Sequence, residues 1–162
     1  MRNRFLLLFV FLFVFAVAPA AYAQSPKPPD VETLRDPDLE RDSLHNLEVA
    51  RNYFKLKKAY VAALKRCEEI IAGNPNFTRI DEVLFMAGQS SLWLAESKGK
   101  QAPSLYISFD GGEKRTLTPE QFRDLGREYL TLLVKDHPES PFSKQAQEGL
   151  AALKTTGRSA TP

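Results

Sequence analysis

The sequence predicts an all-α protein, a short solenoid of about five helices with a β-hairpin inserted between the third and the fourth. Two observations support this prediction. First, two helical hairpins each end at a proline, one running from Leu44 to Pro75 and the other from Asp81 to Pro138. Second, small and apolar residues recur in both hairpins at helical spacing. Repeated two-helix units typically stack into arrays that present an extended binding surface.

The first 23 residues have the pattern of a secretory signal peptide. Arg2 and Arg4 precede an apolar run from Phe5 to Val17, and small residues stand at Ala21 and Ala23. This order predicts export and cleavage after Ala23. An uncleaved inner-membrane anchor is the alternative, because the apolar stretch is close to the ~20 residues that a spanning helix needs. We therefore expect a periplasmic protein.

The folded domain is expected to cover residues 39–154. Residues 24–38 contain four prolines and predict an extended linker, and residues 155–162 predict a disordered tail. No cysteine stands near Ala23 to carry a lipid, so we expect no lipid anchor. Cys67 is the chain's single cysteine and excludes an intramolecular disulfide. Stability must therefore come from packing.

The charge balance argues against a nucleic-acid partner. Of 22 basic residues, Arg2 and Arg4 belong to the leader, which leaves 20 against 20 acidic ones. A nucleic-acid-binding domain is expected to carry an excess of Lys and Arg on one face. We therefore expect partners that are proteins or peptides.

The first hairpin is predicted to consist of helices at residues 43–56 and 58–72. Asp42 or Ser43 can cap the first helix. Gly73-Asn74-Pro75 ends the second, because Gly and Asn accept left-handed geometry and Pro cannot continue a helix. The apolar faces are Leu44, Leu47, Ala50 and Phe54 in the first helix, and Val61, Leu64, Cys67, Ile70 and Ile71 in the second.

The second hairpin is predicted to carry an insert at residues 98–117, after a helix at 80–97. Apolar and polar residues alternate over 104–109, Asp110-Gly111-Gly112 supplies a turn, and 113–117 can return as a second strand. Isolated hairpins are marginally stable in water. The insert is therefore expected either to pack on the helices or to fold on a partner.

Two further helices have clear start signals. Thr118-Pro119-Glu120-Gln121 combines an N-cap Thr, a Pro at the first helical position and a Gln able to close a capping box. That helix ends at His137-Pro138, and Ser140-Pro141 starts the next one. With no helix following it, Phe142 or Leu153 on its apolar flank would be left open to self-association.

Both units place small and large residues where neighbouring helices must pack. These repeat-packing positions are Leu47, Ala50, Phe54, Ala63 and Cys67 in the first unit, and Leu84, Ala87, Gly88, Gly126 and Leu130 in the second. The pattern resembles the tetratricopeptide repeat. Phe54 replaces the usual Tyr, Cys67 replaces Phe, and Arg51 stands where Gly is usual.

The chain resembles tetratricopeptide-repeat (TPR) proteins of the bacterial envelope, particularly the repeat domain of BamD-type outer-membrane assembly lipoproteins. The resemblance covers about residues 44–153, with its motifs at 59–64, 70–75 and 136–142. The lipid-carrying cysteine of those lipoproteins is missing, and there are about two and a half repeats where that family has about five. The resemblance implies a periplasmic scaffold that holds a peptide or partner domain in a concave groove, in outer-membrane or envelope assembly.

In such repeats the first helix of each pair lines the groove, which identifies the candidate partner-binding residues. They are His45, Glu48, Asn52, Lys55, Phe85, Gln89 and Trp93. Phe85 and Trp93 are the candidate anchors, because exposed aromatic residues anchor interfaces. The alternative is that both belong to the core. Under the groove hypothesis, Trp93→Ala or Phe85→Ala is expected to lose binding without unfolding the protein.

The residues give little support for catalysis or for a cofactor. Cys67 lies on an apolar helix face, where a thiol is unreactive. Asp42, His45 and Glu48 have the spacing of a weak metal site, although an ordinary surface cluster fits the same spacing. We therefore expect a non-enzymatic periplasmic adaptor that binds an envelope protein or an extended peptide. The alternatives are a self-associating structural component of an envelope complex and the accessory helical domain of an envelope enzyme.

Overall fold

The computed structural model describes residues 36–110 and 113–158. These residues belong to one compact unit, Arg35–Pro162. The predicted signal peptide lies outside the described residues, as does the predicted linker up to residue 35.

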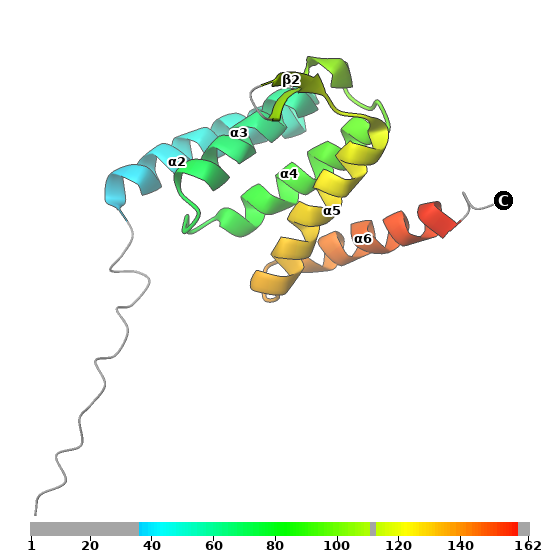
Figure 1. The fold of residues 1–162 in the computed structure, drawn as a ribbon. Helices are drawn as coiled ribbons and strands as arrows, with labels where there is room; N and C mark the ends of the chain where they lie inside the picture. The colour runs from blue at the N-terminus through cyan, green and yellow to red at the C-terminus, as the bar shows by residue number, and fades with distance from the viewer. Residues whose placement is uncertain (1–35, 111–112, 159–162) are drawn as a thin grey trace, which may run out of the picture. The chain divides into compact units, whose positions relative to one another are not determined.

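Five α-helices follow one another, and a two-stranded hairpin lies between the third and the fourth (Figure 1). The helices are α2 (Pro37–Arg51), α3 (Tyr60–Gly73), α4 (Ile80–Ala95), α5 (Pro119–Asp136) and α6 (Ser143–Arg158). Helix α2 continues into a π-helical segment, η2 (Asn52–Lys57). The main contacts of each helix are with the helices before and after it in the sequence. The predicted all-α solenoid with a β-hairpin insert is therefore confirmed.

Two apolar clusters form the core of the described unit. One joins α2, α3 and α4 around Leu47, Leu64 and Met86, and the other joins α4, α5 and α6 around Leu84 and Leu130. Nine of the ten repeat-packing residues are buried, and Phe54 is half-buried. The small and large residues of the repeat pattern thus lie between helices.

Helices α4 and α5 approach each other closely at two glycines. A Cβ atom added to Gly88 would lie 2.6 Å from Cδ2 of Leu130, and one added to Gly126 would lie 2.6 Å from Cδ2 of Leu92. The same Cβ on Gly126 would lie 3.0 Å from the carbonyl oxygen of Gly88. The two backbones therefore pack against each other where neither residue has a side chain.

The first helix begins at Pro37 and not at the predicted Ser43. Asp36 is its N-cap, accepting the N–H of Asp38 at 2.8 Å, and Pro37 occupies the first helical position. Ser43 is instead buried, and its hydroxyl accepts a hydrogen bond from Nδ2 of Asn74 at 3.1 Å. The folded unit thus reaches into the predicted linker.

Other helix ends agree with the prediction to different degrees. The capping box at α5 is present, with Gln121 N–H donating to Thr118 Oγ1 at 3.3 Å and Thr118 N–H donating to Gln121 Oε1 at 2.8 Å. Helix α6 begins at Ser143 and not at Ser140, because a turn from Ser140 precedes it. It extends to Arg158, so residues 155–158 of the predicted tail are helical.

The insert consists of a 3₁₀ turn, η3 (Pro103–Leu105), and the antiparallel strands β1 (Ile107–Asp110) and β2 (Glu113–Thr116). It packs on α3. The N–H of Ala62 donates to Oε1 of Gln101 at 3.0 Å, and Nζ of Lys65 donates to the carbonyl of Ile107 at 3.0 Å. Of the two expected outcomes, packing on the helices is the one observed.

Glu68 of α3 lies under the insert and has an unusual carboxyl environment. It accepts the hydroxyl of Tyr106 at 2.6 Å and that of Tyr129 at 3.4 Å. Burial raises the pKa of Glu68, and the two hydroxyls and the charge of Lys65 offset this only in part. A raised pKa means that the folded state favours the neutral carboxyl.

The Glu68→Gln variant is expected to be more stable than the wild type at neutral pH. The neutral carboxyl of Glu68 contributes to the free energy of unfolding. This contribution is fully present below the ordinary pKa of a glutamate and is lost as pH rises through the higher folded-state pKa. Gln keeps an acceptor for Tyr106 and never ionises. Urea unfolding at pH 4 and pH 7 should show a gain that grows with pH, with exposed Glu69→Gln as the control. A variant that loses stability only at pH 7 would contradict this assignment.

Candidate functional site

A groove runs along α4 between η2 and α6. Its volume is about 530 Å³, and its lining residues are Phe54, Phe85, Gln89, Trp93, Gln145, Glu148 and Gly149. A second hollow of about 290 Å³ shares Gln89, Trp93 and Gly149 and continues past Glu96, Lys98 and Arg123. We call the two together the α4 groove. Its lining residues come from η2, which extends α2, from α4 and from α6, with Arg123 of α5 at the second hollow.

Aromatic rings form the floor of the α4 groove. Trp93 is half-buried and stacks on Phe54 at a centroid distance of 5.0 Å, with Tyr60 tilted against it at 4.5 Å. Phe85 is also half-buried and stacks on Phe142 at 5.1 Å. The core and the groove therefore share these residues, so both readings of Phe85 and Trp93 hold in part.

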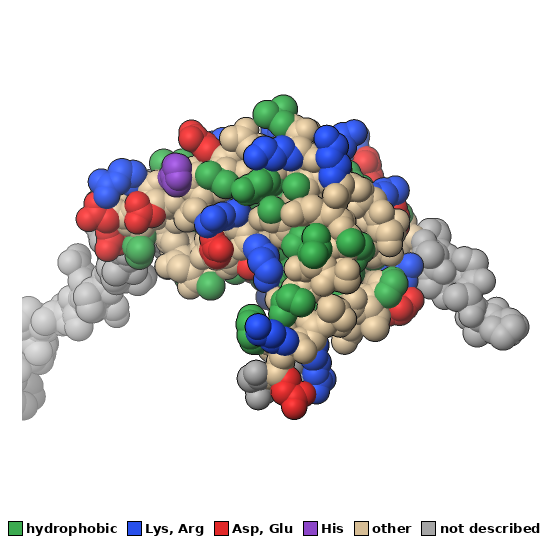
Figure 2. Space-filling model, turned by 90° about the horizontal axis from the view of Figure 1, so that it is seen from above, with side chains coloured by type: hydrophobic (Ala, Val, Ile, Leu, Met, Phe, Trp, Pro, Cys, Tyr) green, Lys and Arg blue, Asp and Glu red, His purple; other side chains and the backbone are tan. Residues whose placement is uncertain are grey.

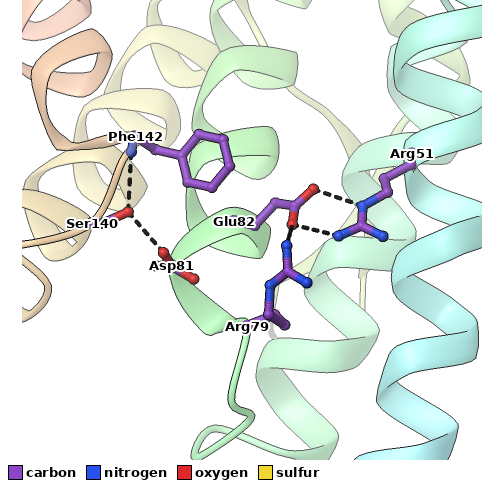
Figure 3. Close-up of polar contacts among 6 residues, drawn as sticks. All are labelled: Arg51, Arg79, Asp81, Glu82, Ser140 and Phe142. Atoms are coloured by element: carbon purple, nitrogen blue, oxygen red, sulfur yellow. Dashed lines mark hydrogen bonds and ion pairs between the residues drawn. The ribbon is translucent and has the colours of Figure 1, made fainter.

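A polar contact fixes the start of α6 against α4 (Figure 3). The hydroxyl of Ser140 donates to Oδ2 of Asp81 at 2.7 Å and accepts the N–H of Phe142 at 3.1 Å. The ring of Phe142, the residue whose N–H makes this contact, stacks on Phe85. One wall of the groove is thereby held by both a hydrogen-bonded turn and a ring contact.

An ion-pair network fixes the opposite wall (Figure 3). Arg51 of α2 donates from Nε and from one terminal nitrogen to the two carboxylate oxygens of Glu82, at 2.7 and 2.6 Å. Arg79 donates to the same carboxylate at 2.6 Å. The Glu82 side chain is only 6% exposed. Burial alone would raise the pKa of Glu82, but the hydrogen bond and charge of Arg51, with the charge of Arg79, hold it below its ordinary value.

The Arg51→Ala variant is expected to lower the free energy of unfolding by about 2 kcal/mol, because it removes a two-pronged charged contact from a buried carboxylate. Arg79 remains and limits the loss. Because the folded-state pKa of Glu82 is lowered, the pair's contribution is present above the ordinary carboxyl pKa and is lost as pH falls through the folded value. Denaturant unfolding should therefore show a larger loss of stability at pH 7 than at pH 3. Arg66→Ala, which removes an exposed pair with Glu69, is the control and should cost under about 0.5 kcal/mol. Equal losses in the two variants would contradict the network.

The structure places the seven predicted groove residues in two groups. Phe85, Gln89 and Trp93 line the α4 groove. The four on the first helix and its extension, His45, Glu48, Asn52 and Lys55, are exposed and are not among its lining residues. From this part of the chain the α4 groove is lined by Phe54 of η2 instead.

The prediction also missed the wall formed by α6. Gln145, Glu148 and Gly149 recur at i, i+3 and i+4, so they share one face of that helix. The spacing that identified candidate groove residues on the earlier helices is also present in α6, so the sequence contained the signal for this face. Phe142 and Leu153, which the sequence suggested as open to self-association, are half-buried.

The described residues offer no metal centre. Across 36–110 and 113–158, no three His, Cys, Asp or Glu side chains converge in a way that could hold an ion, so Asp42, His45 and Glu48 do not form one. Cys67 is buried and its pKa is raised, chiefly by burial. In the same part of the chain, no helix has the length and apolar character needed to span a bilayer.

The chemistry of the α4 groove suits an extended polypeptide. Aromatic rings on its floor can accept apolar side chains, and the amides of Gln89 and Gln145 can pair with a peptide backbone. Its charged residues, Glu96 and Glu148 against Lys98 and Arg123, balance in sign. No protein-family model, curated protein or solved structure matches this chain.

Proposed function

We propose that this protein is an exported periplasmic adaptor of the tetratricopeptide-repeat type, whose α4 groove binds an extended segment of an envelope protein. The observation that carries the proposal is a groove with an aromatic floor that η2, α4 and α6 line together. The leader supports export, and the resemblance to BamD-type proteins supports a role in outer-membrane or envelope assembly.

Binding in this groove would draw on a surface that is already in place. The Arg51–Glu82 pair holds the α2 wall, and the Asp81–Ser140 contact holds the α6 wall. A preformed site spares the partner part of the entropic cost of association. The balanced charge favours a partner segment that is apolar and uncharged over one that is strongly acidic or basic.

The described residues add no observation in favour of the two alternatives. Self-association was suggested by an open apolar flank on the last helix, but Phe142 and Leu153 of that flank are half-buried. A role as part of an enzyme had only the Asp42–His45–Glu48 spacing as its basis.

The proposal is tested by affinity capture from an envelope extract with the chain starting at Gln24. The groove variant is Gln89→Ala/Gln145→Ala/Glu148→Ala, which changes lining side chains without touching the aromatic floor. The control variant is Arg127→Ala/Thr131→Ala/Lys135→Ala, exposed on α5. We expect a protein that is retained by the wild type and the control and lost by the groove variant. Equal retention by all three would refute the groove as the binding site.

A further inference from the structure

The three most exposed large apolar side chains in the described part of the chain belong to η2 and the insert. Leu56 is 75% exposed, Phe109 is 67% exposed and Leu105 is 59% exposed. Leu56 lies in η2, Leu105 in η3 and Phe109 in β1. Single exposed apolar residues are ordinary, but several at one place mark an interaction surface.

These segments lie at one end of the unit. The N–H of Lys100, at the start of the insert, donates to the carbonyl of Lys58 at 2.9 Å, directly after η2. The hairpin and the end of η2 lie together at the top of Figure 1. We call residues 56–58 with the described insert residues, 98–110 and 113–116, the insert end.

The insert end is also rich in positive charge. Its basic residues are Lys57, Lys58, Lys98, Lys100, Lys114 and Arg115. Its acidic residues are Glu96, at its edge, Asp110 and Glu113. Glu96 pairs with Lys98 and Glu113 with Arg115, which leaves a clear cationic excess. Figure 2 shows this side of the unit from above, where apolar side chains are set among Lys and Arg side chains.

We propose that the insert end docks on the surface of an anionic phospholipid bilayer. Leucine and phenylalanine side chains that protrude by more than half of their surface can enter the boundary between headgroups and acyl chains. The surrounding lysines then lie at the level of the anionic headgroups, which attract them electrostatically. An acidic protein or a nucleic acid would account for the lysines alone, whereas a bilayer also accounts for the protruding apolar side chains. This surface uses none of the residues of the proposed peptide groove except Glu96 and Lys98 at its edge.

The chain starting at Gln24 is suitable for the test, because both core clusters lie between Leu47 and Leu153 and the truncation therefore keeps the whole packed unit. It also removes the apolar leader, which would bind lipid by itself. Binding is measured by flotation with phosphatidylcholine vesicles that either contain or lack phosphatidylglycerol, at low and high salt. Circular dichroism confirms that each variant is folded.

Two variants and two controls separate the contribution of the apolar side chains to vesicle binding from that of the lysines. The apolar variant is Leu56→Ser/Leu105→Ser/Phe109→Ser, and the charge variant is Lys58→Glu/Lys100→Glu/Lys114→Glu. Their controls change exposed residues of the same kinds elsewhere, as Leu39→Ser/Leu44→Ser and Lys135→Glu/Lys144→Glu/Lys154→Glu.

The proposal predicts binding to phosphatidylglycerol vesicles that weakens with salt, falls about tenfold or more in each insert-end variant and is unchanged in the controls. No binding by the wild type, or equal binding by wild type and both variants, would overturn it. Loss of binding in the charge variant alone would also overturn it, because the surface would then recognise charge without inserting apolar side chains. A duplex DNA probe bound more tightly than the vesicles would assign the surface to nucleic acid instead.

Discussion

The Trp93→Ala variant is expected to lower the free energy of unfolding by about 3 kcal/mol. The indole is held between Phe54 of η2 and Tyr60 of α3, at 5.0 and 4.5 Å, so it joins the first hairpin to α4. Its removal deletes two ring contacts and leaves a void that these segments cannot fill without moving. Urea denaturation followed by circular dichroism measures the change.

The matched control is Phe109→Ala, which removes an aromatic side chain from an exposed position. Its cost should stay within about 0.5 kcal/mol. A loss for Trp93→Ala no larger than that of the control would contradict the ring cluster. The same reasoning corrects the expectation that alanine at Trp93 or Phe85 would affect binding without unfolding, because both rings also support the core.

The Gly126→Val variant is expected to destabilise the protein by about 3 kcal/mol. The first carbon of the new side chain would lie 2.6 Å from Cδ2 of Leu92 and 3.0 Å from the carbonyl oxygen of Gly88. One of these groups is backbone, so the two helices must separate to accommodate the change. Thermal and urea unfolding should both report the loss.

Gly73→Ala serves as the control for that variant, since an added Cβ at Gly73 meets nothing within 4 Å. It should be neutral or slightly stabilising, as alanine restricts the unfolded chain more than glycine does. If Gly126→Val unfolds with the same midpoint as Gly73→Ala, the close approach of α4 and α5 is wrong.

Local signals in the sequence were sufficient to predict the five helices, the hairpin and their order along the chain. Helical periodicity located the helices, the Thr118–Gln121 capping box marked the start of α5, and the Asp110-Gly111-Gly112 turn predicted the hairpin. These features depend on residues within a few positions of one another. The missed start of α2 at Pro37 was also readable, because Asp36 followed by Pro37 is a helix start signal of the same kind.

The candidate site was less predictable because it depends on partners far apart in the chain. Arg51 appeared in the sequence only as a departure from the repeat pattern, whereas the structure pairs it with Glu82 on another helix. The helical periodicity of apolar residues does not show which charged residue is buried, so it could not predict the burial of Glu82. The π-helical segment after Arg51 was not predicted, and within it Phe54 lines the groove whereas Asn52 is exposed.

Several residues that stabilise the fold also hold the walls of the α4 groove in place. Arg51 and Trp93 stabilise the side formed by α2 and η2, while Asp81 and Ser140 hold α6 in place. Changes at these residues are expected to alter binding through the shape of the groove. Polar lining residues outside the aromatic floor, such as Gln89 and Gln145, are therefore the ones that separate contact with a partner from support of the fold.

Site-specific photo-crosslinking shows directly whether the α4 groove binds an extended peptide segment. A photoreactive amino acid is placed at Gln145 in the groove wall or, in a matched chain, at Thr131 on the outer face of α5, and each is irradiated in an envelope extract. If the groove binds a peptide, position 145 will crosslink to one continuous segment of a partner protein, and position 131 will not crosslink to that segment. Crosslinks to the same segment from both positions, or only to copies of this chain, would contradict a peptide-binding groove.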